Sequence, residues 1–490
     1  MGSRPRLTAL RWVAVVLAAA PAGAATAPSP ARQLAEQARA DYRAGDHFAA
    51  LAAAHRALAR DPGDPAALSL NAQLVRDAAG PVPALPPFEQ ALKAAPGDTE
   101  VIGDYAATLA EAGRGADALR ALRQLGERDP ANRRARFLQA LLAARSGHDD
   151  EARRLLWQMG DDPAPAANLL SGIIELRSGS ARGAVERFAA LARRQPDNPT
   201  VHLLLGRALL ASGDANEVVA RFAPLAERGD ASPYLLTLVG RAYEQLGDRA
   251  RAARYLDRAQ RPPAGGAWAL PAAVGDAQNP LSPAAAVATL RELAGQGKPQ
   301  AGPALAARLA ARYPGSADVA RIAGDAALLA GEPAPALAAY RRAATVRSDF
   351  ALTARMAAAA RQSGRANEAL ALLDRRARDN PLERLSAVAL AQAHAERAEW
   401  PQAAAWLERA NPPGGADPRL LGALAQARLM HGDAAGALAA ASQAHRLQRA
   451  NGAIAHVLAG ALAAQGRSRE AAVLAAAAGE LAGLPQSAGR

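Results

Sequence analysis

Residues 233–259 of this chain read PYLLTLVGRAYEQLGDRARAARYLDRA. The stretch is rich in Ala and Leu, which suit helices, and Gly247 follows its first helical part. A glycine in that place is a natural C-cap, because glycine enters the left-handed backbone region without steric cost. The stretch therefore predicts two helices joined by a tight turn.

The same turn glycine recurs along the chain with a nearly constant period. Neighbouring copies lie 32 to 34 residues apart, and two gaps of 68 residues would each hold one copy without the glycine. A series of prolines keeps the same period, since Pro62, Pro96 and Pro130 are separated by 34 residues. These markers predict thirteen helical pairs. The eleven turn glycines are Gly45, Gly113, Gly147, Gly179, Gly213, Gly247, Gly297, Gly331, Gly364, Gly432 and Gly466. The pairs are expected to start at residues 31, 65, 99, 133, 165, 199, 233, 283, 317, 350, 384, 418 and 452.

The composition favours the same class of fold. Half of the 490 residues are hydrophobic but only 4% are aromatic, so the apolar content is mostly Ala and Leu, which suits close helix packing better than a sheet. The eighth position of each copy is Ala or Gly in all copies but one, where it is Leu290. Small residues there let the two helices of a hairpin approach closely.

In this register the residues resemble the tetratricopeptide repeat, with Leu236, Val239-Gly240, Tyr243 and Ala252 in the best copy. The resemblance implies an all-α, right-handed α-solenoid of about thirteen helix-turn-helix repeats. Other helical-pair solenoids remain an alternative, since several copies lack the full signature.

A longer interval predicts a division of the array. Gly247 and Gly297 are 50 residues apart, and the excess is rich in Pro and Gly. We expect a loop at 263–282 between an N-terminal array of about seven repeats (31–262) and a C-terminal array of about six (283–485).

Two copies depart from the pattern. The copy at 283 has Leu290 where a small residue is expected and Gly302 where alanine is usual. The second copy opens its second helix with four prolines, so that helix is expected to begin only near Phe88. The four are Pro81, Pro83, Pro86 and Pro87.

The N-terminus is typical of a secretory signal. Arg4, Arg6 and Arg11 precede an apolar stretch and then the small residues 22–24. We expect a signal peptide at 1–24 and a periplasmic or otherwise exported protein; a retained anchor helix is the alternative. The chain has no cysteine, so it is not expected to be a lipoprotein.

No motif in the sequence predicts catalysis. The histidines form no His-Glu-x-x-His motif, and Gly295–Lys298 lacks the rest of a phosphate-binding loop. We therefore predict a protein that is not an enzyme, with no cofactor and no metal. The formal charge is +12, but basic and acidic residues are interspersed, so nucleic acid is not an expected partner.

The resemblance also implies a binding surface. In this family positions 2, 5, 9, 12 and 13 of each first helix line a concave face that holds peptides or helices. Apolar side chains here would form a trough with Arg at its rim, suited to a partner segment with hydrophobic anchors and acidic residues. The alternative is that packing between neighbouring helices absorbs the apolar positions. The candidate residues are Arg39, Arg76, Phe137, Leu141, Leu169, Ile173, Leu203, Arg207, Arg241 and Arg321.

Two functional hypotheses follow. The first is an exported scaffold that binds protein or peptide partners in the cell envelope, for secretion or assembly of an exopolysaccharide or a surface protein. The second is a helical array associated with glycan or peptidoglycan, serving as the non-catalytic arm of an enzyme. Self-association at the C-terminal edge is a further hypothesis.

Overall fold

The computed structural model describes residues 29–160, 164–196, 198–228, 231–260, 283–411 and 417–482. The expected signal peptide (1–24) and the expected loop (263–282) lie outside the described residues. The ends of the two predicted arrays, at 261–262 and 483–485, lie outside them as well.

The described residues form twenty-six α-helices arranged as thirteen consecutive hairpins. We call α1–α14 the first array and α15–α26 the second array. The first array contains α1 (Pro30–Ala44), α2 (His47–Arg60), α3 (Pro65–Ala79), α4 (Pro81–Ala94), α5 (Thr99–Glu111), α6 (Gly115–Arg128), α7 (Arg133–Arg145), α8 (Asp149–Trp157), α9 (Pro165–Arg177), α10 (Ala181–Arg194), α11 (Pro199–Ser212), α12 (Ala215–Ala226), α13 (Pro233–Gln245) and α14 (Arg249–Gln260). The second array contains α15 (Pro283–Gly295), the 3₁₀ turn η1 (Pro299–Ala301), α16 (Gly302–Arg312), α17 (Ala317–Leu329), α18 (Pro333–Ala344), α19 (Phe350–Gln362), α20 (Ala366–Asp379), α21 (Arg384–Glu396), α22 (Trp400–Ala410), α23 (Pro418–Met430), α24 (Ala434–Leu447), α25 (Gly452–Ala464) and α26 (Ser468–Ala482).

The expected all-α solenoid of thirteen repeats is confirmed. The first helix of every hairpin begins at the residue that the period predicts, except that α1 begins one residue earlier. Within each array, successive hairpins pack on one another, so each repeat buries its apolar faces against its neighbours. None of the described helices meets the length and hydropathy that crossing a membrane requires.

The turns within the hairpins use the left-handed region, as expected. All eleven predicted glycines have positive φ, between 70° and 93°. The two copies that were expected to lack this glycine also turn there. One uses Gly80, with φ of 105°, and the other uses Ala398, with φ of 59°. The turn is therefore a property of every repeat.

Small residues at the eighth position permit the close approach of the two helices. A Cβ added at Gly324 would lie 2.4 Å from the ring of Tyr340, and one at Gly172 would lie 2.7 Å from the ring of Phe188. Both aromatic rings are fully buried. A glycine in these repeats thus makes room for a large residue on the facing helix.

In the repeat at 283 the large residue lies on the first helix and the glycine lies on the second. Leu290 is buried at the position where other repeats have a small residue, and Gly302 faces it from α16. A Cβ on Gly302 would lie 3.0 Å from Leu290 Cδ2. The departure seen in the sequence is therefore a complementary pair.

The expectation for the second repeat was wrong. Helix α4 begins at Pro81, and Pro86 and Pro87 lie inside it. Proline in the first turn costs little, because the N–H that it lacks has no helical partner there. Pro86 and Pro87 remove two later helical hydrogen bonds, but Leu85 and Phe88 are buried in the repeat core and hold the helix in place.

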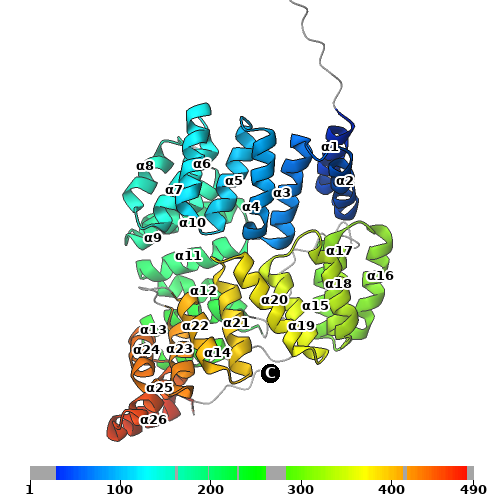
Figure 1. The fold of residues 1–490 in the computed structure, drawn as a ribbon. Coiled ribbons are helices and arrows are strands. Elements are labelled where there is room, and N and C mark those ends of the chain that lie inside the picture. The colour runs from blue at the N-terminus through cyan, green and yellow to red at the C-terminus, as the bar shows by residue number, and fades with distance from the viewer. Residues whose placement is uncertain are drawn as a thin grey trace, which may run out of the picture.

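The second array lies alongside the first. Figure 1 shows α17 and α18 below α1 and α2, and α19 and α20 below α3 and α4. Helix α4 contacts α20, and α14 contacts α25 and α26. We call this contact between the two arrays the seam.

Candidate partner-binding site

The apolar candidates lie on the first helices of three consecutive repeats. α7 contacts α9 and α9 contacts α11, so their side chains form one continuous surface. The five apolar candidates are half-buried and pack against the cores of their repeats. Part of each side chain is therefore buried within the repeats, and part remains exposed. We call these five residues the apolar strip; they are Phe137, Leu141, Leu169, Ile173 and Leu203.

Arginines lie along the strip, and they differ in what they contact. Arg207 is exposed on α11. Arg177 is ion-paired with Asp149. Arg241 lies 3.6 Å from Glu244, whose carboxylate also accepts a hydrogen bond from the second array. Of these three, Arg207 is the one that is exposed and forms no ion pair with the described residues.

The two arginines predicted at the N-terminal end have different surroundings. Arg39 is half-buried on α1. Arg76 lies 3.9 Å from Asp77 and lines a cavity of about 500 Å³ in the seam. Arg134, Arg347 and other polar residues of both arrays share that cavity. Arg76 thus faces the second array, outside the apolar strip.

Arg321 belongs to a buried polar cluster in the second array. Asp325, only 3% exposed, accepts hydrogen bonds from Arg321 at 3.1 Å and from Tyr340 at 2.8 Å, and it is ion-paired with Arg355 at 2.8 Å. Burial and the neighbouring carboxylate raise the pKa of Tyr340 far above its ordinary value. The cluster joins α17, α18 and α19, so the contacts of Arg321 serve the fold.

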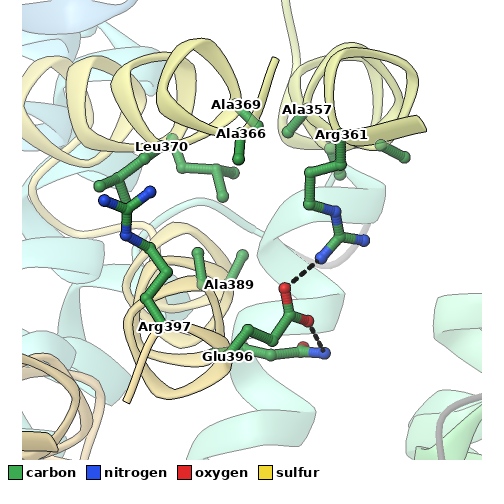
Figure 2. Close-up of a pocket in the computed structure, with 13 residues that line it drawn as sticks. Ala357, Arg361, Ala366, Ala369, Leu370, Ala389, Glu396 and Arg397 are labelled. Carbon is green, nitrogen blue, oxygen red and sulfur yellow. Dashed lines mark hydrogen bonds and ion pairs between the residues drawn. The ribbon is translucent and has the colours of Figure 1, made fainter. Parts of the chain in front are cut away.

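A second surface was missed by the sequence prediction. It involves two of the first helices of the repeats, which we call the inner helices, and one second helix. A hollow of about 80 Å³ lies between α19, α20 and α21. Figure 2 shows residues that line it. Arg361 and Glu396 form an ion pair of 2.6 Å at its rim. Its floor is lined mainly by alanine; Ala354, Ala357, Ala358, Ala366, Ala369, Ala389 and Ala393 contribute.

The signal for this hollow was present in the sequence. Ala354, Ala358 and Arg361 occupy positions 5, 9 and 12 of one copy, and Gln392 and Glu396 occupy positions 9 and 13 of the next. Small residues at consecutive inner positions leave a depression, because no side chain fills the space between adjacent helices. The sequence prediction considered only large apolar and basic residues, so it did not include the alanines of this hollow.

The arrangement suits binding by shape and charge. In the part of the chain that the structure describes, no group of three or more His, Asp or Glu side chains could hold a metal ion. The inner helices offer apolar side chains, arginine and ion pairs to a partner.

Comparisons with known proteins fit this architecture. A family model described as tetratricopeptide repeat matches residues 83–144 and 175–242, and a second model of that description matches residues 287–350. No curated protein matches the chain.

Several solved structures are similar to parts of the chain or to most of it. A tetratricopeptide repeat protein from Parabacteroides merdae is 17% identical, with 48% of this chain and 94% of that chain covered and a TM-score of 0.37. The type IV pilus biogenesis factor PilW is 21% identical over 44% of this chain and 100% of that chain, with a TM-score of 0.40. A chain of the APC/C hetero-tetramer Cut9-Hcn1 is 13% identical over 89% of this chain and 97% of that chain, with a TM-score of 0.31.

Proposed function

This chain is a tetratricopeptide-repeat protein, and from that premise we propose that it is an exported adaptor that holds a partner protein by an extended segment. The coarser part of this statement follows from the repeats, which imply a non-catalytic scaffold for protein interactions. Proteins built from such repeats are typically not enzymes. The partner segment has apolar anchors and acidic side chains.

The apolar strip carries this proposal. Five half-buried apolar side chains on three adjacent helices offer a surface that loses further contact with water when a partner covers it. Exposed Arg207 beside them favours a carboxylate in the partner, because Arg pairs with carboxylates in a fixed bidentate geometry.

The hollow between α19 and α21 adds a second anchor point. A volume of about 80 Å³ is smaller than the engineered cavity of about 150 Å³ that binds benzene, so it suits the end of one aliphatic side chain. The ion pair at its rim offers Arg361 and Glu396 to polar groups that flank that side chain. We therefore expect the partner's two anchors to be spaced along an extended segment.

Export and a role in the cell envelope complete the proposal. The basic, apolar and small-residue order of residues 1–24 supports export. The partner would then be an envelope protein involved in secretion or assembly of an exopolysaccharide or a surface protein. The alternative is a glycan- or peptidoglycan-associated array, against which the low aromatic content argues, since sugars stack on aromatic rings.

Capture from an envelope extract tests the proposal. The full chain is immobilised, captured proteins are identified, and the double variant Leu169→Ser with Ile173→Ser is compared with the unaltered chain. We expect capture of the specific partner to fall at least about tenfold, which corresponds to about 1.4 kcal/mol. The Arg207→Glu variant should reduce capture of the same partner and weaken its dependence on salt.

Matched controls separate binding from folding. Leu119→Ser with Leu225→Ser changes two exposed apolar residues on the second helices of their repeats and should leave capture unchanged. Both double variants should keep their helical content in circular dichroism. Undiminished capture by the folded Leu169→Ser, Ile173→Ser chain would refute the strip, and retention on polysaccharide without a protein partner would favour the glycan hypothesis.

A further inference from the structure

The seam joins unlike edges of the two arrays. The first array contributes the turns within its hairpins, such as Asp46 and His47, and the second array contributes the turns between its hairpins, such as Gly315 and Ser348. Each inner helix starts at a turn between hairpins and ends at a turn within a hairpin. Because the seam contacts the turns within the hairpins of the first array, it covers one edge of the concave face that the inner helices of this array form. Access to that face from this side requires the seam to part.

The seam is held by a small number of specific contacts. Phe48 N–H donates to Gly315 O at 3.1 Å, and Ser348 N–H donates to Asp77 O at 2.9 Å. The guanidinium of Arg342 lies 4.6 Å from the centre of the Phe48 ring. Each of these polar contacts contributes little in water. Phe48 and Ala450 also pack across the seam against the apolar core of the facing array. A small number of contacts thus holds the seam, so the loss of one of them weakens it.

We propose that the seam is a releasable clasp, that the ring of His47 makes its closure depend on pH, and that opening it admits the partner segment to the inner face. The admission of a partner segment rests on the proposed function. The clasp and its pH dependence concern this chain alone.

The geometry assigns a single protonation state to His47 in the closed form. His47 Nδ1 accepts a hydrogen bond from the backbone N–H of Ala317 at 3.1 Å. Ala317 is the first residue of α17 and is buried, and the N–H groups of a helix's first turn have no partner within the helix. Nδ1 can accept only when it carries no proton, so the closed seam requires the neutral ring. Protonation would leave the Ala317 N–H unpaired beside the positive end of the α17 dipole.

Charged and polar groups surround this ring on every packed element. The ring of Tyr42 on α1 meets His47 edge-on at 5.1 Å. Asp46 precedes it, Asp318 lies on α17, and Arg347 lies in the turn after α18, where it donates to Asp318 at 3.2 Å. The two carboxylates favour the charged ring and Arg347 opposes it.

Desolvation in the seam is the largest of these influences. It lowers the pKa of His47 below its ordinary value of 6.5, and Arg347 acts in the same direction, while Asp318 and Asp46 oppose it. The closed chain therefore binds this proton more weakly than the open chain does. The contribution of His47 to closure is present above pH 6.5 and is lost as the pH falls from 6.5 through the lowered pKa.

A distance measurement across the seam tests the clasp. The chain has no cysteine, so spin labels on Arg56→Cys in α2 and Ala311→Cys in α16, both at exposed positions, report on the seam alone. Between about pH 7.5 and pH 5.5 we expect the population with a long distance to rise at least about twofold. His47→Gln should keep the short distance at both values, because its amide oxygen can accept the Ala317 N–H and does not titrate.

The control is His55→Gln, which changes an exposed histidine on the same helix and should preserve the transition. Circular dichroism at both pH values shows that the repeats remain folded. A distance that is constant in the unaltered chain, or a transition that survives in His47→Gln, would overturn the clasp.

A crosslink tests the link to binding. A Cβ on Gly315 would lie 2.6 Å from Asp46 Cγ, so Asp46→Cys with Gly315→Cys can form a disulfide that locks the seam. We expect the oxidised form to capture at least about tenfold less of the partner than the reduced form of the same variant. Equal capture would overturn the role in access. Normal capture by Leu169→Ser, Ile173→Ser would instead refute the proposed function and leave the pH-dependent clasp standing.

Discussion

Ala398 has a positive φ at a turn where the twelve other repeats have glycine with a positive φ. Its φ is 59°, and it lies 34 residues after Gly364 and 34 before Gly432, at the turn within its hairpin. A Cβ in the left-handed region crowds the following carbonyl oxygen, which costs about 1–2 kcal/mol. The repeat tolerates this cost because packing on both sides determines the turn.

This conformation makes a prediction. We expect Ala398→Gly to raise the free energy of unfolding by up to about 1 kcal/mol, since relief of strain exceeds the added entropy of the unfolded chain. Urea unfolding followed by circular dichroism measures the change. Gly364→Ala, at the equivalent turn of the preceding repeat with φ of 73°, should have the opposite sign. Equal signs for the two substitutions would contradict the assignment of strain to the turn.

At the scale of the helix pair, complementarity of size decides what a repeat tolerates. Tyr340 and Phe188 each fill the space that a glycine leaves on the facing helix. Leu290 and Gly302 achieve the same closeness with the large residue on the other helix. The sequence pattern places the small residue on the first helix of each pair. The physical requirement is only that one large and one small side chain together fill the space between the two helices.

A double-mutant cycle tests this exchange in the repeat at 283. Leu290→Ala should cost about 2–5 kcal/mol, because it leaves a cavity in the core. Gly302→Ala should destabilise the unaltered chain through contact with Leu290, and should stabilise the Leu290→Ala background by filling part of the cavity. Chemical unfolding of the four chains gives the coupling energy, expected at about 1 kcal/mol or more. Additive effects would show that the two residues do not share a volume.

For the whole molecule, the seam determines the arrangement of the two arrays. Phe48 packs against the core of α17–α21 and lies under Arg342, so it is the main apolar contact from α2 across the seam. We expect Phe48→Ala to loosen the seam while leaving the repeats intact. Small-angle scattering should show a larger radius of gyration, with unchanged helical content. Leu119→Ala removes an exposed side chain from α6 and should change neither quantity. An unchanged radius in Phe48→Ala would show that other contacts hold the arrays together.

The candidate site was only partly accessible from sequence. The apolar strip and Arg207 could be named because the family's inner positions follow from the register. The spacing allows Arg321 to pair with Asp325 one helical turn away, but it does not show that the pair is buried, because the other partners of Asp325, Tyr340 and Arg355, come from α18 and α19. The hollow at Ala354 and Ala358 was missed because a depression is defined by side chains that are absent.

The sequence by itself determined the repeat, its register and the turn of nearly every hairpin. These features depend on contacts between residues less than one period apart, and local contacts leave a periodic trace such as Gly113 and Gly147. Only the tertiary structure decided that the second array lies against the first, with His47 beside Ala317, 270 positions along the chain. This hydrogen bond joins two turns at one place in the molecule and is not repeated along the chain. A periodic sequence pattern therefore cannot predict it.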